Sequence, residues 1–156
     1  MKQFAFCLVV IILLAVNGLA QSKSKNTTKS QSIIGNIKNT SVIEGCSCSL
    51  STRKNSNSYV FLSDYEKKQA WMNIDRRDIK LNFVSTTQKR RATRAERKGD
   101  RFTDNWSAGG VEVKIDYVVI APMTGPEKEY TDYGITITVT KNGKTQTVKA
   151  FGNCGC

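Results

Sequence analysis

Apolar and polar residues alternate along several stretches of this sequence, and this alternation restricts those stretches to β-strands. The clearest stretch covers residues 111–119, where apolar residues lie at every second position: Val111, Val113, Ile115, Tyr117 and Val119. Successive side chains of an extended chain point to opposite faces, so these residues share one face. The pattern therefore predicts a strand with one buried and one solvated face.

Two other regions alternate in the same way, and each surrounds a turn signal. Residues 70–83 alternate on both sides of a charged turn at 75–78, and residues 135–150 alternate on both sides of Asn142-Gly143. Asn-Gly between alternating runs is a strong hairpin signal, because both turn positions adopt positive φ. Residues 59–62 form a further short β-branched and aromatic run. We therefore expect antiparallel hairpins.

These runs predict an all-β fold for residues 42–156, which we expect to form a single domain. The only helical candidate is the stretch 89–98, and no apolar stripe supports it. Five to seven strands without crossover helices predict a small antiparallel barrel or sandwich. The barrel is favoured, because consecutive hairpins give a meander and pairing the first strand with the last removes two exposed edges.

The N-terminus predicts export from the cytoplasm. Residues 1–2 include a lysine, residues 4–16 are an uninterrupted apolar run, and Gly18-Leu19-Ala20 resembles a cleavage site. This is the pattern of a secretory signal peptide over residues 1–20. A membrane anchor is the alternative, but a spanning helix needs roughly 20 apolar residues. We therefore expect a periplasmic or extracellular protein with no membrane span after the signal peptide is removed.

Without residues 1–20 the chain retains four cysteines in two C-x-C units, one near each end: Cys46, Cys48, Cys154 and Cys156. An even number in an exported chain indicates disulfides. In an antiparallel arrangement Cys46 faces Cys156 and Cys48 faces Cys154, and linking the units in parallel order is the second possibility. The same sulfurs could bind zinc or copper(I), or serve redox chemistry. We expect disulfides that join the two ends of the domain, with no bound metal and no cofactor.

The net charge of +11 is concentrated in two segments of the chain. Residues 21–41 contain four lysines and no acidic residue among many Ser, Thr, Asn and Gln. Such a segment buries too little apolar surface to fold, so we expect a disordered polar and basic linker. Residues 89–98, KRRATRAERK, contain six basic residues and one acidic residue. The remainder of the chain is nearly neutral.

The basic stretch 89–98 is the candidate binding site, through its six cations: Lys89, Arg90, Arg91, Arg94, Arg97 and Lys98. The arginine fork matches phosphate and carboxylate geometry, so we expect an anionic partner. The candidates are a lipid head group or polysaccharide of the cell envelope, and a protein is the alternative partner. Nucleic acid is disfavoured, because the cations fall in a tail and one loop instead of lining a face with stacking aromatics.

Two resemblances add to this interpretation. The segment Ala70-Trp71-Met72-Asn73-Ile74-Asp75, with Asp78-Ile79-Lys80-Leu81 and the ending Gly152-Asn153-Cys154-Gly155-Cys156, resembles small exported bacterial β proteins of uncharacterised activity that end in C-G-C. That resemblance implies a compartment and a fold, but no activity. The order of an apolar hairpin, then Gly99-Asp100-Arg101-Phe102, then a strand from Val111 is similar to periplasmic barrels that inhibit c-type lysozymes. Their Ser-Gly loop has no counterpart here, and a basic loop would repel a basic lysozyme.

The residues predict no catalytic site. The chain contains no histidine, which excludes Ser-His-Asp and Cys-His nucleophiles and histidine-bound zinc. No carboxylate is marked as buried in a cleft, as glycoside hydrolysis would require. We expect Trp71 and Trp106 to pack in the core instead of stacking on a ligand. The chain is therefore expected to be a non-enzymatic binding or structural protein of the envelope or extracellular space. A four-cysteine metal protein and a small inhibitor of a secreted enzyme are the alternatives.

Overall fold

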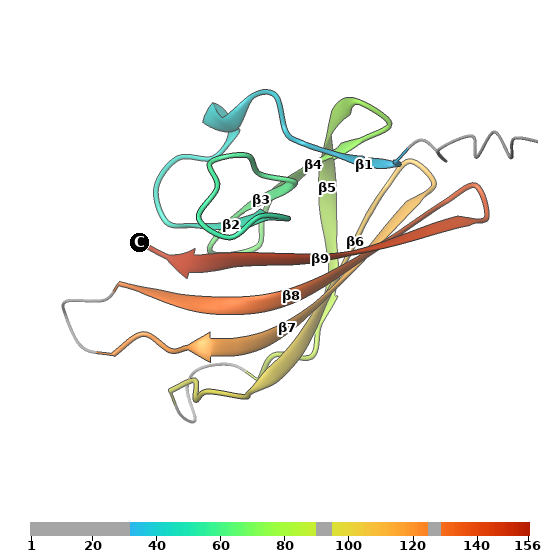
Figure 1. The fold of residues 1–156 in the computed structure, drawn as a ribbon. Coiled ribbons are helices and arrows are strands. Elements are labelled where there is room, and N and C mark those ends of the chain that lie inside the picture. The colour runs from blue at the N-terminus through green and yellow to red at the C-terminus, as the bar shows by residue number, and fades with distance from the viewer. Residues whose placement is uncertain (1–31, 90–94, 125–128) are drawn as a thin grey trace, which may run out of the picture. The chain divides into compact units, whose positions relative to one another are not determined.

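The computed structural model describes residues 32–89, 95–124 and 129–156, and most of them lie in strands (Figure 1). The only helical element in these ranges is a 3-10 turn, η1 (Thr40–Val42). The strands are β1 (Ile34–Gly35), β2 (Ser47–Ser51), β3 (Phe61–Asp64), β4 (Ala70–Ile74), β5 (Arg77–Thr86), β6 (Arg101–Ala108), β7 (Val111–Ala121), β8 (Tyr130–Lys141) and β9 (Lys144–Gly155). Among the described residues, no helix is long and apolar enough to cross a membrane.

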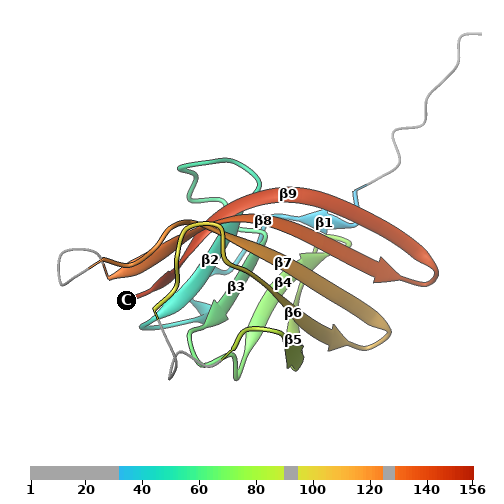
Figure 2. The ribbon, with the colours of Figure 1, turned by 90° about the horizontal axis from the view of Figure 1, so that it is seen from below.

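Strands β2 to β9 form a closed antiparallel barrel. Each strand pairs with the next one along the chain and β9 pairs back with β2, so the connectivity is a meander. Figure 2 shows the long strands β8 and β9 arching over the short strands β2 to β4. The two-residue strand β1 pairs with β4. The predicted all-β barrel, with its first and last strands joined, is therefore confirmed.

The number of strands is larger than the predicted five to seven, because the described residues form eight barrel strands and β1. The prediction missed β2 and β6, because both carry polar side chains at positions where the alternating pattern of a strand requires apolar ones. In β6 the buried positions are Phe102, Asp104 and Trp106, so an aspartate interrupts the apolar series. In β2 the residues are three serines, one cysteine and one leucine. A hydrophobic pattern alone does not detect such strands.

The inward side chains of the long strands fill the barrel. The five apolar residues of the stretch 111–119 are all buried, as the alternation predicts. Trp106 is buried as well, with its ring edge-on to Phe61 and Phe83 at centroid distances of 5.6 and 5.2 Å. Trp71 on β4 is partly buried. Each large apolar side chain that becomes fully buried contributes about 1.5–3 kcal/mol, so this interior is the main source of stability.

Two disulfides cross the junction between the first and last barrel strands. Cys46 is bonded to Cys156 and Cys48 to Cys154, so the predicted antiparallel pairing is confirmed. Cys48 and Cys154 are direct partners in the β2–β9 ladder. Because all four sulfurs are in disulfides, the alternative four-thiolate metal site is not formed. The described residues contain no other cluster of three or more potential metal ligands.

The segment before β2 packs on the barrel through Asp78. One carboxylate oxygen of Asp78 accepts hydrogen bonds from the backbone N–H groups of Lys38 and Asn39, at 2.8 and 3.1 Å. The other oxygen accepts one from Asn73 Nδ2 at 2.5 Å. Burial alone would raise the pKa of Asp78, but these hydrogen bonds outweigh it and hold the pKa below its ordinary value. The charged turn at 75–78 is therefore a structural anchor.

The predicted linker 21–41 is folded in its last part. Ile34–Gly35 forms β1, which pairs with Asn73 and Ile74 of β4. The side chain of Gln146 on β9 accepts hydrogen bonds from the backbone N–H groups of Ile33 and Ile34, which supports β1 from the other side. The folded region thus starts before residue 42. Residues 1–31 lie outside the described ranges, and with them the predicted signal peptide and the first part of the linker.

Candidate binding site at the barrel mouth

A pocket of about 360 Å³ lies at the end of the barrel where the β3–β4 turn and the β5–β6 loop meet; we call this end the mouth. In Figure 1 it is the end near the C-terminus marker. Its walls include five aromatic side chains and one disulfide: Tyr65, Phe83, Phe102, Tyr117, Tyr133 and Cys48–Cys154. The polar part of the lining consists of Thr86, Gln88 and four charged residues: Glu66, Lys67, Lys89 and Asp104. The volume and the mixture of apolar walls with few polar groups are typical of small-molecule sites.

The aromatic wall is a direct result of strand register. Phe102 on β6 and Tyr117 on β7 are cross-strand partners, and their rings stack at 4.4 Å between centroids. Tyr133 on β8 contacts both rings edge-on, at 5.7 Å from Phe102 and 5.4 Å from Tyr117. Stacked and edge-on contacts of this kind fix ring orientation. The three rings therefore form one packed cluster without a ligand.

A charged pair lies between these rings. Asp104 on β6 is only 1% exposed, and Lys67 in the β3–β4 turn is 18% exposed. Lys67 Nζ is 2.8 Å from Asp104 Oδ1 and 5.1 Å from the centroid of the Phe102 ring. A carboxylate at this depth requires a counter-charge, and Lys67 supplies it. The charge of Lys67 is therefore already neutralised by Asp104.

Hydrogen bonds extend this pair into a network that reaches the β5–β6 loop. Lys67 Nζ donates to Gln88 Oε1 at 3.1 Å, and Gln88 Nε2 donates to Glu96 Oε1 at 2.7 Å. Tyr133 Oη donates to Glu96 Oε2 at 2.8 Å. Gln88 comes directly before the basic stretch 89–98 and Glu96 lies within it, so the network holds described residues from both ends of the loop at the mouth.

The buried phenol of Tyr117 is an inert part of the wall. Burial raises the pKa of Tyr117 well above its ordinary value, and the nearby Asp104 and Tyr133 act in the same direction. The phenol therefore keeps its proton at physiological pH. It can form hydrogen bonds with a ligand but does not provide a phenolate nucleophile.

The structure places the predicted basic site beside this pocket. Lys89 is exposed and lines the pocket, and Arg97 and Lys98 are exposed on the same loop. Within the described ranges, no carboxylate is paired with the side chains of these three residues. The other predicted residues, Arg90, Arg91 and Arg94, lie outside the described residues.

Sequence reasoning missed the residues that form the buried network. Asp104 carried a usable signal, because it shares the inward phase of β6 with Phe102 and Trp106. A charged residue in the buried phase of a strand indicates either a partner or a site. Lys67, Gln88 and Glu96 lie in a turn and a loop, where no period reveals which side chains face inward.

Fold and pocket together define a small disulfide-closed meander barrel with a preformed pocket at one end. Comparison with protein-family models, curated proteins and solved structures gives no match to this chain. The function is therefore inferred from the chemistry of the pocket and the surface.

Proposed function

We propose that this chain is a non-enzymatic exported binding protein whose ligand is a small anionic amphiphile held at the barrel mouth. The observation that carries the proposal is the combination, in one pocket, of packed aromatic walls with Lys89 at the rim, a cation that has no carboxylate partner among the described residues. Eight-stranded barrels are just wide enough to be filled by side chains or to hold one small ligand. A ligand with an apolar body and an anionic head matches both parts of this pocket.

The charges around the pocket explain why Lys89 is the residue proposed to select an anionic ligand. Lys67 and Asp104 neutralise each other, and Glu66 is ion-paired with Lys68. Among the described charged residues that line this pocket, Lys89 is the one without an ion-pair partner. Arg97 and Lys98 lie on the same loop, and the proposal assigns them, with Arg90, Arg91 and Arg94, a role in long-range attraction of anions.

An anionic lipid of the envelope has the chemistry that this pocket requires. The two disulfides are consistent with an oxidising compartment outside the cytoplasm. The pocket volume of about 360 Å³ suits a head group and the start of an acyl chain, or a free amphiphile, better than a polymer. We therefore propose the lipid head group as the predicted anionic partner at this site.

Two dyes of similar shape and different charge test the proposal. We expect 1-anilinonaphthalene-8-sulfonate and the uncharged N-phenyl-1-naphthylamine both to bind saturably, one per chain. Lys89→Glu should weaken the binding of the sulfonate dye by about fivefold, which corresponds to roughly 1 kcal/mol for an exposed charge contact. The affinity for the neutral dye should stay unchanged. Fluorescence titration at low and at physiological salt measures both affinities.

Lys144→Glu is the matched control, because Lys144 is an exposed lysine at the opposite end of the barrel and has no ion-pair partner within the described ranges. It should leave both affinities unchanged. Equal weakening by the two variants would refute a site at the rim, and so would the absence of saturable binding of either dye. Vesicles of anionic lipid, compared with micelle-free short-chain amphiphile, then distinguish a lipid from a soluble ligand.

A further inference from the structure

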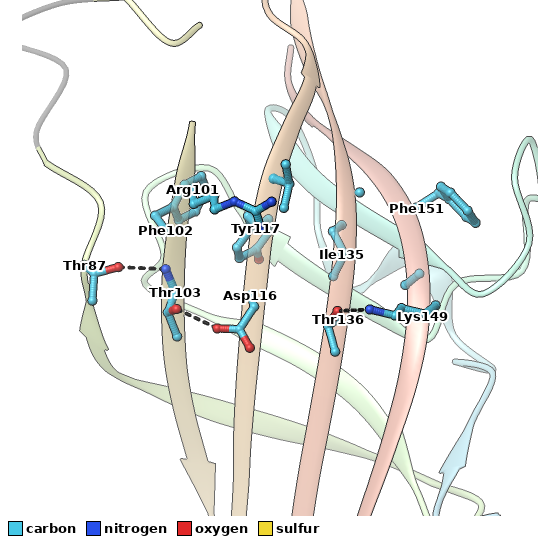
Figure 3. A pocket seen from close by; sticks show the side chains of 13 residues that line it. Thr87, Arg101, Phe102, Thr103, Asp116, Tyr117, Ile135, Thr136, Lys149 and Phe151 are labelled. Atoms are coloured by element: carbon cyan, nitrogen blue, oxygen red, sulfur yellow. Dashed lines mark hydrogen bonds between the residues drawn. The ribbon is translucent and has the colours of Figure 1, made fainter. Parts of the chain in front are cut away.

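The outer face of the barrel carries a row of polar side chains across four strands. Thr103, Asp116, Thr136 and Lys149 are successive cross-strand partners on β6, β7, β8 and β9. Figure 3 shows the row, with Thr103 Oγ1 donating to Asp116 Oδ1 at 2.6 Å and Lys149 Nζ donating to Thr136 Oγ1 at 2.9 Å. An open hollow of about 710 Å³ lies over the row, and Arg101 and Phe151 flank it.

A second hollow, of about 650 Å³, lies on the other side of Phe151. The β2–β3 loop and the outer side of β2, β8 and β9 form it. Its lining is rich in hydroxyl and amide groups, from Ser49, Ser51, Asn55, Ser56, Asn57 and Asn153. Phe151 lines both hollows, so they adjoin at this residue. We call the two hollows together the outer groove.

Large apolar side chains are exposed in the outer groove, two in the second hollow and Phe151 where the two hollows adjoin. Ile120 is 45% exposed, Tyr130 is 43% exposed and Phe151 is 39% exposed. Gly134 lies directly opposite Phe151 in the β8–β9 ladder. A Cβ atom added at Gly134 would lie only 3.3 Å from Ile120 Cδ1, so the glycine leaves space for the Ile120 side chain. A sugar ring has an apolar C–H face and a rim of hydroxyls, so rings surrounded by amide and hydroxyl groups match it.

The charges of the outer groove favour an anionic ligand. Four cations line it, and none of their side chains is ion-paired with a carboxylate of the described residues: Arg53, Lys54, Arg101 and Lys149. The lining acids are Asp116 and Asp132, and Asp116 is already 3.0 Å from Lys114 Nζ. Lys149 Nζ donates to the neutral Thr136 hydroxyl, so its charge is not neutralised by that contact. Arginine and lysine side chains without a carboxylate partner can bind carboxylate, sulfate or phosphate groups.

We propose that the outer groove binds an acidic polysaccharide, whose chain crosses Phe151 from one hollow to the other. A protein partner would be expected to bury a core depleted of charge, whereas here charges and hydroxyl groups line the whole length. The cations and exposed rings of the outer groove do not line the mouth pocket. This site is therefore separate from the one proposed for the amphiphile.

Binding to polygalacturonate, with neutral dextran as the uncharged comparison, tests the proposal. We expect the wild-type protein to be retarded in native gels that contain polygalacturonate and to move freely in dextran. Arg101→Glu/Lys149→Glu should weaken binding by about tenfold, the loss of two charge contacts. Phe151→Ser should weaken it by about fivefold without loss of fold, because the side chain is partly exposed; circular dichroism checks the fold.

Lys80→Glu/Lys144→Glu is the matched control, since it changes the net charge equally at two exposed lysines outside both hollows. It should bind polygalacturonate nearly as well as wild type. Equal loss in the two double variants, or no binding by the wild type, would overturn the proposal. Lys89→Glu should keep polysaccharide binding, so failure of the mouth site and failure of the outer groove are distinguishable.

Discussion

The two ends of this barrel are stabilised by different kinds of interaction. At the mouth, strands end in an ion pair, a hydrogen-bond network and two disulfides. At the opposite end, which we call the hairpin end, β6–β7 and β8–β9 are joined by two-residue turns, and the inward side chains are the apolar Val111, Val113, Ile137 and Val139. Asn142 and Gly143 both have positive φ, as a tight hairpin turn requires.

The difference shows how a small barrel can hold polar groups in its interior. The apolar hairpin end aligns the strands, so the mouth can use interior positions for Asp104 and the residues bound to it. Loops that emerge at such an end commonly carry function, because they are positioned by a rigid scaffold. We expect perturbations at the two ends to have different costs.

The largest effect is expected from loss of the covalent closure at the mouth. Each disulfide closes a loop of more than a hundred residues, with separations of 110 and 106. The chain-entropy model gives about 4.7 kcal/mol for the first closure and far less for the second. Replacing all four cysteines by serine should therefore lower the free energy of unfolding by about 5 kcal/mol, as measured in guanidinium chloride.

A much smaller loss would show that the hydrogen bonds of the β2–β9 ladder are enough to close the barrel.

The mass of the intact protein, purified from the host that produces it, is an independent check of the disulfides. We expect a chain that starts at Gln21 and lacks four hydrogens, and a mass that includes residues 1–20 would contradict the predicted signal peptide.

An intermediate effect is expected from the buried ion pair. Lys67→Met leaves the carboxylate of Asp104 without its counter-charge and should cost about 3 kcal/mol, the low end for a buried pair because Lys67 is 18% exposed. Lys67→Met/Asp104→Leu removes both charges and should cost less than the single change, because the surroundings are apolar. Urea unfolding of both variants and of Asp104→Leu completes a double-mutant cycle.

The hairpin end provides the matched control for this pair. Lys141 Nζ is 2.6 Å from Asp75 Oδ2, and both side chains are substantially exposed. Lys141→Met should cost no more than about 1 kcal/mol. If the two lysine variants were equally destabilised, burial would not be the reason for the difference between the ends.

The smallest effect concerns pH and the anchor at Asp78. Its pKa in the folded protein lies below its ordinary value of about 3.9, so its stabilising contribution is present above about pH 4 and is lost as pH falls through the folded pKa. Asp78→Asn should be about 1 kcal/mol less stable than wild type at pH 7, with a difference that shrinks towards pH 2. Urea unfolding at the two pH values measures it, and a difference independent of pH would contradict the proposed role of the charge.

The same contrast between the ends explains what the sequence could predict. Period-two alternation identified β7, the Asn-Gly hairpin and the antiparallel cysteine pairs, because these depend on local pattern and simple strand geometry. β6 was not predicted, because Asp104 interrupts its apolar alternation. The burial of Asp104 depends on its contact with Lys67, which is distant in the sequence. The network of Gln88, Glu96 and Tyr133 depends on where two loops meet. Tertiary contacts of this kind have no local signature.

The disulfides also turn the domain into a covalent ring that runs from Cys46 to Cys156 and back. A protease that cuts any one peptide bond inside this ring opens it without releasing a fragment, because both pieces stay attached through the two bridges. The lysines and arginines of the stretch 89–98 are obvious targets for trypsin-like enzymes. A single cut there would leave two β-sheet halves that are still tethered, and so able to remain associated after cleavage.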